Sequence, residues 1–184
     1  QGSLVRFDGG FDSFEGNTIV FVNVDGSSGN KIGGSRAAHW MLLETAFSAL
    51  TTKQANGLWL THNEHPLINQ TGRATLKNAR ENGIFVFRAN RASDILQALA
   101  FSQQHNLNAV ISGGQEAWIV REELVASGTP VVINALDNLP GSFDGLGARL
   151  DNATLLHEAG ITLLFTSGET HNARKLRQVA GNAV

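Results

Sequence analysis

Residues 84–134 read IFVFRANRASDILQALAFSQQHNLNAVISGGQEAWIVREELVASGTPVVIN. This stretch contains three short apolar segments, at residues 84–89, 108–112 and 130–134, separated by longer segments with apolar residues at helical spacing. The apolar segments are continuous rather than alternating, which is typical of strands buried on both faces. The stretch therefore predicts strand–helix units in a parallel sheet that is covered by helices.

The same alternation of strands and helices extends along the chain in both directions. Two further strands are expected at residues 18–24 and 161–166, and a short apolar patch at 58–60 is another candidate strand. The expected helices lie at residues 36–50, 66–82, 93–105, 115–126, 152–159 and 171–184. Ser35 is the expected N-cap of the first helix, and Gly83 and Gly160 are expected to end the helices before them. A glycine-rich loop at 26–34 and a long loop at 135–149 complete this interpretation.

The number of strand–helix units bears on the architecture. Four parallel strands in succession indicate either a doubly wound sheet or part of a (β/α)₈ TIM barrel. A complete barrel needs about 250 residues, and this chain has 184. We therefore expect residues 1–184 to form one partial barrel-like α/β domain, as a fragment or as one of several chains of a larger protein. Because unpaired sheet edges promote association, an oligomer or the remainder of a parent chain is the expected partner.

Composition narrows the classes of function. The formal net charge of −2 provides no basic surface for a phosphate backbone, so nucleic acid is not an expected partner. The chain has no cysteine, which excludes disulfides, thiolate nucleophiles and zinc–thiolate sites. It also has no run of about 18 apolar residues, so no membrane anchor is expected. A small-molecule ligand is the expected partner of a soluble chain, in the cytoplasm or the periplasm.

Ligand sites of both parallel architectures lie at the C-terminal ends of the strands. The candidate ligand-binding residues at these positions are Arg88, Asn90, Arg91, Ser112, Glu116 and Asn134. Arginine forks match carboxylates and phosphates, and the glycine turn at 113–114 exposes backbone N–H groups, so an oxyanion is the candidate ligand. The alternative is that the arginines pair with Glu116 or Asp94, and that the serine and asparagine side chains cap helices and turns.

Glu169 and His171 form the candidate catalytic pair. They follow the strand at 161–166, where a carboxylate and an imidazole are able to act as general acid and base. The alternative is a turn that caps the last helix. Of the other histidines, His62 and His65 have a spacing that permits metal ligation in a helix, but a solvated loop is the favoured interpretation of this polar segment. His39 and His157 fall inside expected helices, and His105 falls at a helix end.

Four segments resemble a known protein family. Residues 88–99 (RANRASDILQAL) and 112–118 (SGGQEAW) resemble the fifth and sixth barrel units of imidazolonepropionase-like members of the amidohydrolase superfamily. Residues 150–161 (LDNATLLHEAGI) and 165–177 (FTSGETHNARKLR) resemble the last barrel unit of the same group. The resemblance covers residues 84–184 well and the first third of the chain loosely.

The resemblance implies a metal-dependent hydrolase of C–N bonds in cyclic amides. The family holds one or two divalent metals, usually zinc, through a His-x-His pair on the first strand, histidines on the fifth and sixth strands and an aspartate on the eighth. The metal lowers the pKa of a bound water, so that hydroxide forms near neutral pH. The corresponding positions here are Arg88 or Asn90, Ser112 or Gly113, and Gly168 or Glu169, and the first-strand pair is absent.

These substitutions remove every imidazole ligand, so the resemblance implies a degenerate metal site, and this chain is expected to hold no metal or other cofactor. Two interpretations of function are open. The chain is either an amidohydrolase-like hydrolase whose catalytic residues are altered or lie elsewhere, or a non-catalytic amidohydrolase-like scaffold used for binding or assembly.

Overall fold

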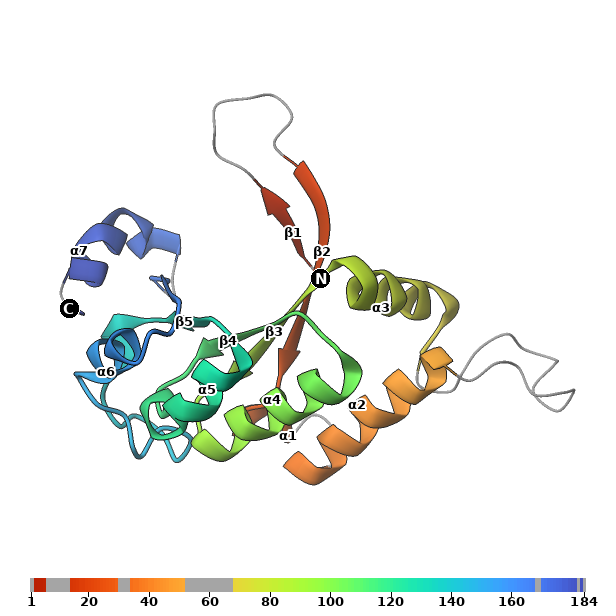
Figure 1. Ribbon diagram of the computed structural model, residues 1–184, viewed down its shortest axis with the longest axis horizontal. Coiled ribbons are helices and arrows are strands. Elements are labelled where there is room, and N and C mark those ends of the chain that lie inside the picture. The colour runs from red at the N-terminus through yellow and green to blue at the C-terminus, as the bar shows by residue number, and fades with distance from the viewer. Residues whose placement is uncertain are drawn as a thin grey trace, which may run out of the picture.

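The structure is a computed structural model that describes residues 2–5, 14–29, 34–51, 68–167, 170–181 and 183. These residues form one six-stranded sheet with the strand order β1-β2-β3-β4-β5-β6 (Figure 1). The strands are β1 (Gly2–Val5), β2 (Phe14–Asn23), β3 (Ile84–Ala89), β4 (Ala109–Gly113), β5 (Val131–Ile133) and β6 (Leu163–Phe165). β1 pairs with β2 in the antiparallel sense, and each later strand pairs parallel to the one before it.

Seven α-helices and three short 3₁₀ helices lie within the described ranges. The α-helices are α1 (Gly26–Gly29), α2 (Arg36–Thr51), α3 (Gln70–Asn82), α4 (Ala92–His105), α5 (Arg121–Ser127), α6 (Asn152–Glu158) and α7 (Leu176–Gly181). The 3₁₀ helices are η1 (Ala117–Val120), η2 (Ala135–Asp137) and η3 (Thr170–Lys175). None of these helices combines the length and the apolar character needed to cross a membrane.

The strand order distinguishes between the two predicted architectures. Crossovers between parallel strands are right-handed, so a sheet whose strands follow the sequence in one direction has all its crossover helices on one face. A doubly wound sheet instead reverses direction at a switch point. Figure 1 shows α2, α4 and α5 together along one side of the sheet. The chain therefore forms part of a TIM-barrel-like fold, which confirms the predicted fold class.

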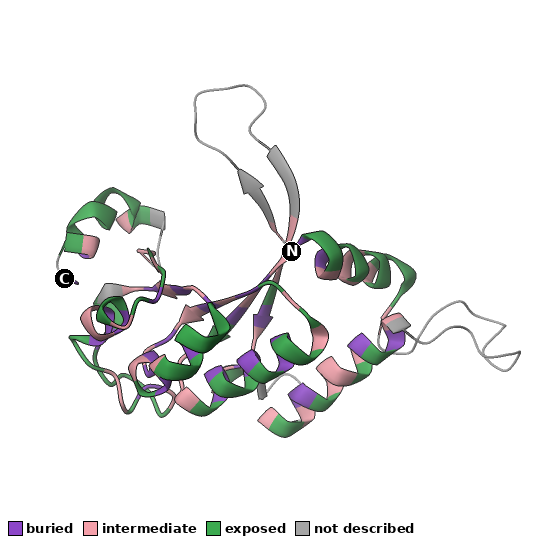
Figure 2. Cartoon of the chain, in the orientation of Figure 1, coloured by how far each residue is buried: buried purple, intermediate pink, exposed green. Residues whose placement is uncertain are grey.

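The core lies between the sheet and these helices. Buried residues line the strands and the inner sides of the helices, as Figure 2 shows. An aromatic cluster forms its centre, with Phe101 of α4 5.0 Å from Phe47 and 5.5 Å from Trp40 between ring centroids. Phe85 and Phe87 of β3 complete this cluster and are fully buried. Truncating one such ring to alanine typically costs about 3–5 kcal/mol of stability.

The opposite face of the sheet has no covering layer among the described residues. Its side chains are also mostly apolar, because strands of this kind of sheet are built for burial on both faces. Phe21 is 62% exposed and Leu164 is 47% exposed. Val86 and Val110, which are register neighbours on β3 and β4, are half-buried. We call this surface the open face.

Most predicted elements are confirmed to within a few residues. Ser35 caps α2 as predicted, accepting the Ala38 N–H at 3.1 Å, and Gly160 ends α6 in the left-handed conformation (φ 84°). Gly83 ends α3 for a different reason, because its backbone is extended and not left-handed. A Cβ atom at this position would collide with the Thr18 carbonyl oxygen of β2. The close approach of helix and strand therefore requires this glycine.

Two helix predictions were wrong in part. The expected helix at 115–126 begins as η1 and continues as α5, and the expected helix at 171–184 is η3 followed by α7, which ends at Gly181. The first difference has a local cause. The Asn152 side chain accepts the Trp118 N–H and donates to the Gly114 carbonyl, the two groups that an α-helix would have joined directly. The candidate strand at 58–60 lies outside the described residues.

Candidate functional site

A polar row crosses the open face at the C-terminal ends of three neighbouring strands. The register aligns Asn23 of β2 with Arg88 of β3, and Arg88 with Ser112 of β4. The Arg88 side chain is 69% exposed, and its Nε lies 3.9 Å from an Asp25 oxygen, which is the outer limit of an ion pair. Val132 and Leu164 continue the row on β5 and β6. The row therefore presents one guanidinium group between an amide and a hydroxyl group.

Glu116 lies at the same strand ends, but its carboxylate faces the interior. The residue is 8% exposed. Its Oε2 accepts the Ala92 N–H at the start of α4, and its Oε1 accepts the Gly147 N–H of the long loop, each at 2.9 Å. A carboxylate at a helix N-terminus also interacts favourably with the helix dipole. Both oxygens of Glu116 therefore hold α4 and the loop together.

The remaining candidate ligand-binding residues lie in turns and at the start of a helix, which is close to what the alternative of capping predicted. Asn134 accepts the Leu136 N–H and donates to Asp137, which closes the turn after β5. The Asn90 carbonyl oxygen accepts the Glu116 N–H. Arg91 precedes α4, and its carbonyl oxygen accepts the first N–H groups of that helix. The structure thus brings Arg88 and Ser112 together on the open face, with Asn23, which was not predicted from the sequence.

An ion-pair network fastens the long loop across the strand ends. Arg36 at the start of α2 contacts Asp94 of α4 (Nε to Oδ2, 3.1 Å) and also Asp144 of the loop. Asp144 accepts the Gly26 N–H as well, so the loop after β5 reaches back to the end of β2. Burial raises the pKa of Asp94, and the charge of Arg36 opposes that rise. The pairing of Asp94 with Arg88 or Arg91 through a salt bridge is not observed.

Trp118 provides a second attachment of the same loop. Its indole Nε1 donates to the Gly147 carbonyl at 2.8 Å, and the guanidinium carbon of Arg149 lies 4.7 Å from the ring centroid. Gln115 donates to the Asp137 carbonyl at 2.8 Å. These contacts leave four large apolar residues of the loop exposed, namely Leu136, Leu139, Phe143 and Leu146. The loop is therefore held by its polar groups rather than by its apolar side chains.

The candidate catalytic pair is described only in part. His171 lies in η3 and is exposed, whereas Glu169 lies outside the described residues, as do His62 and His65. The pair therefore stays a prediction. Of the other histidines, His105 lies 3.0 Å from Glu44 (Nε2 to Oε2), His157 is exposed, and His39 is buried in α2.

The residues at the described strand ends do not fit the zinc ion that the family resemblance implies. A guanidinium group carries a positive charge and has no lone pair for a cation, and a serine hydroxyl is not among the usual zinc ligands. Within the part of the chain that the structure describes, no three histidine, aspartate or glutamate residues are grouped closely enough to hold a metal ion.

Comparison with known proteins supports the fold. No family model matches the sequence, and no curated protein matches it either. Among solved structures, the crystal structure of an amidohydrolase from Thermotoga maritima MSB8 is similar, with a TM-score of 0.65 and 16% sequence identity. The match covers 82% of this chain and 41% of that chain, so the chain spans less than half the length of that protein. At this identity the likeness shows the fold alone, and that fold is amidohydrolase-like.

Proposed function

We propose that this chain is an amidohydrolase-like scaffold that binds a small carboxylate-bearing molecule at the C-terminal ends of β2, β3 and β4. The observation that carries the proposal is the exposed guanidinium group of Arg88 in the row with Asn23 and Ser112. A guanidinium fork binds a carboxylate through two parallel N–H donors. The flanking amide and hydroxyl groups supply further donors to the same oxygens.

The charge of the row favours a carboxylate over a phosphate. Arg88 is the cationic member of the row, and Asp25 lies near it at 3.9 Å. Arg91, the other expected cation, precedes α4 and interacts electrostatically with Asp94. One guanidinium group matches the single charge of a carboxylate better than the near-double charge of a phosphate monoester. The half-buried valines of the open face, Val86 and Val110, offer an apolar surface for the body of the ligand.

A binding assay on the full chain tests this proposal. Benzoate and benzamide have nearly the same shape, but only benzoate carries a charge. Isothermal titration is expected to give a preference for benzoate of about tenfold, in line with a charge-assisted hydrogen-bonded pair. The preference should disappear in Arg88→Gln and persist in Arg177→Gln, which changes an exposed arginine of α7. An undiminished preference in Arg88→Gln would contradict the proposal.

Hydrolysis of C–N bonds in cyclic amides is the second candidate function, and the likeness to an amidohydrolase favours it. Glu169 and His171 would supply its acid–base groups. The two candidates differ in metal content and in turnover. The chain is dialysed first against zinc and then against buffer. Its bound zinc is then measured by mass spectrometry, and its turnover is measured as the ring opening of a cyclic imide. About one zinc per chain together with turnover that is lost in His171→Gln would favour the hydrolase.

A further inference from the structure

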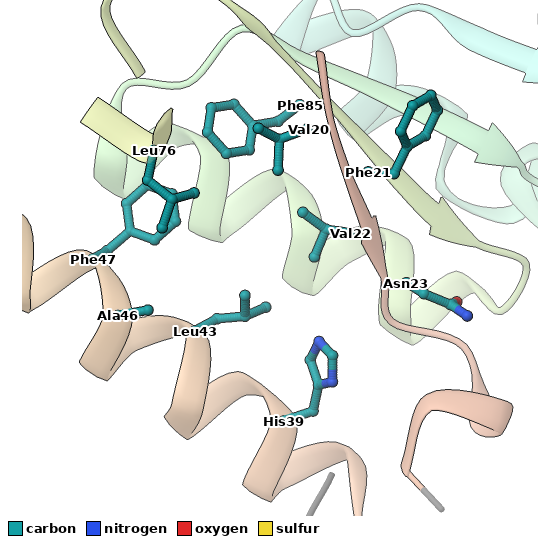
Figure 3. A pocket seen from close by; sticks show the side chains of 10 residues that line it. All are labelled: Val20, Phe21, Val22, Asn23, His39, Leu43, Ala46, Phe47, Leu76 and Phe85. Carbon is teal, nitrogen blue, oxygen red and sulfur yellow. The ribbon is translucent and has the colours of Figure 1, made fainter. Parts of the chain in front are cut away.

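A pocket of about 360 Å³ lies between α2 and β2, on the helix-covered side of the sheet (Figure 3). Leu43, Ala46 and Phe47 of α2 form one wall, and Leu76 of α3 and Phe85 of β3 close its far end. Its volume is within the range of small-molecule sites. Asn23 of the polar row also borders the pocket, but its amide points away from His39 (Figure 3), so a ligand bound beside His39 does not depend on the proposed function.

His39 is the polar side chain aimed into this pocket. Figure 3 shows its ring pointing from α2 toward Val22, whereas the Asn23 amide points away from it. His39 is 7% exposed, and neither ring nitrogen has a hydrogen-bond partner among the described residues. Buried polar groups are almost always hydrogen-bonded, so an imidazole with two unpartnered nitrogens needs an explanation. Both nitrogens are shielded by the surrounding side chains in the structure, so a group that enters the pocket would supply the missing partner after a turn of the imidazole ring.

Water satisfies this site poorly. A buried water molecule needs two to four polar partners, and besides His39 and the averted Asn23 the pocket lining is apolar. The pocket is partly open to solvent, and a hydrocarbon that displaces water from its apolar walls gains the free energy of burying apolar surface. The best occupant therefore has a hydrocarbon body and one hydrogen-bonding group placed beside the imidazole.

The state of the imidazole defines that group further. Burial lowers the pKa of His39, so the ring is neutral at neutral pH. A neutral imidazole has one N–H donor and one acceptor nitrogen. A hydroxyl group is able to pair with either nitrogen, because it both donates and accepts. A carboxylate or ammonium group would enter without a compensating charge, and its desolvation would oppose binding.

We propose that this pocket is a binding site for an uncharged, mainly hydrocarbon molecule with a single hydroxyl group, which pairs with His39. Phenols and naphthols belong to this chemical class. Phe47 and Phe85 supply aromatic rings on the walls, against which a flat ring packs in an offset or edge-to-face arrangement.

The test compares 2-naphthol with naphthalene in fluorescence titrations of the full chain. Both probes should saturate one site, with 2-naphthol bound about tenfold more tightly, as expected for one buried hydrogen bond. His39→Leu should reduce this preference to about twofold or less while naphthalene still binds, because leucine restores an apolar wall. Absence of saturable binding, or an unchanged preference in His39→Leu, would overturn the proposal.

Two further variants on α2 locate the site. Ala46→Phe fills the pocket and should abolish the binding of both probes. Met41→Phe places the same phenylalanine side chain on the outer side of the same helix, where Met41 is 70% exposed, and should leave binding unchanged. Nitrogen NMR of the native chain avoids any dependence on folded variants. 2-Naphthol should shift the ring nitrogens of His39 and not those of the other five of the six histidines; shifts that spare His39 would contradict the assignment.

Discussion

Glu116 is a buried carboxylate whose two oxygens each accept one backbone N–H, from Ala92 and from Gly147. Glu116→Gln keeps the shape of the side chain, but its amide nitrogen is a donor and cannot accept one of the two backbone N–H groups. The hydrogen bond that remains loses the charge of the carboxylate. We expect a loss of about 1–3 kcal/mol in the free energy of unfolding, measured by urea denaturation. Glu123→Gln on the exposed side of α5 is the matched control and should change stability by less than about 0.5 kcal/mol. Equal stability of the two variants would contradict the structural role.

His39 gives the chain a specific dependence of stability on pH. Burial lowers its pKa from the ordinary value of 6.5, so the unfolded chain binds this proton more readily than the folded chain. The contribution of neutral His39 is therefore fully present above about pH 6.5 and is lost as the pH falls through the lowered pKa. Between about pH 7 and pH 5, the unfolding free energy of the native chain should fall more steeply than that of His39→Leu.

Urea denaturation at a series of pH values measures this difference. Leu43→Met is the control, because it changes a neighbouring wall of the pocket without adding or removing a titrating group. Parallel pH profiles for the native chain and His39→Leu would show that the protonation of His39 is not coupled to folding.

The polar residues at the strand ends could be predicted from the sequence, but their partners could not. Arg88 and Ser112 were predicted, and the parallel register explains why they meet. Asn23 was missed because the strand at 18–24 was not aligned with the later strands. The true partner of Asp94 is Arg36, which lies 58 residues earlier in the sequence. Ion pairs of this kind depend on how helices pack, and no local pattern encodes them.

At the scale of elements, local pattern was most informative where strands and helices are regular. β3 and α2 were predicted almost to the residue, because a β-branched or aromatic run and a capped apolar stripe are strong local signals. The region 115–126 was predicted as one continuous helix, and its first turn proved to be 3₁₀ because a distant amide intervenes. That amide belongs to Asn152, which is fully buried.

Removing the Asn152 amide should therefore be costly. Asn152→Ala leaves the Trp118 N–H without its partner and removes one of the two donors to the buried Gly114 carbonyl, which also accepts the Ala117 N–H. We expect a loss of about 2–4 kcal/mol in the free energy of unfolding. Asn82→Ala at the exposed end of α3 removes the same group from a solvated position and should cost little. If the two variants unfold at the same urea concentration, the bridge does not stabilise the fold.

At the scale of the whole molecule, the alternation of strands and helices predicted a parallel sheet but did not distinguish a doubly wound sheet from part of a TIM barrel. The order β1 to β6 resolves this, because the parallel strands advance in one direction across the sheet and α2, α4 and α5 lie along one side of it. β1 pairs with β2, so β1 and the short β6 are the outer strands of the described sheet. The open face remains as a large apolar surface. The sequence predicted a partner only for the unpaired edges of the sheet and did not predict this face.

We propose that this open face mediates association of the chain, since exposed apolar patches on sheets are common sites of protein contact. Phe21 and Leu164 are its most exposed large side chains, at 62% and 47%. The native chain should bind a hydrophobic dye and show a mass by light scattering that rises with concentration. Phe21→Lys combined with Leu164→Lys should weaken both signals, because lysine side chains on a sheet face oppose its burial. Met41→Lys, on the helix-covered side, should leave them unchanged. A native chain that stays monomeric and binds no dye across the concentration range would refute the association.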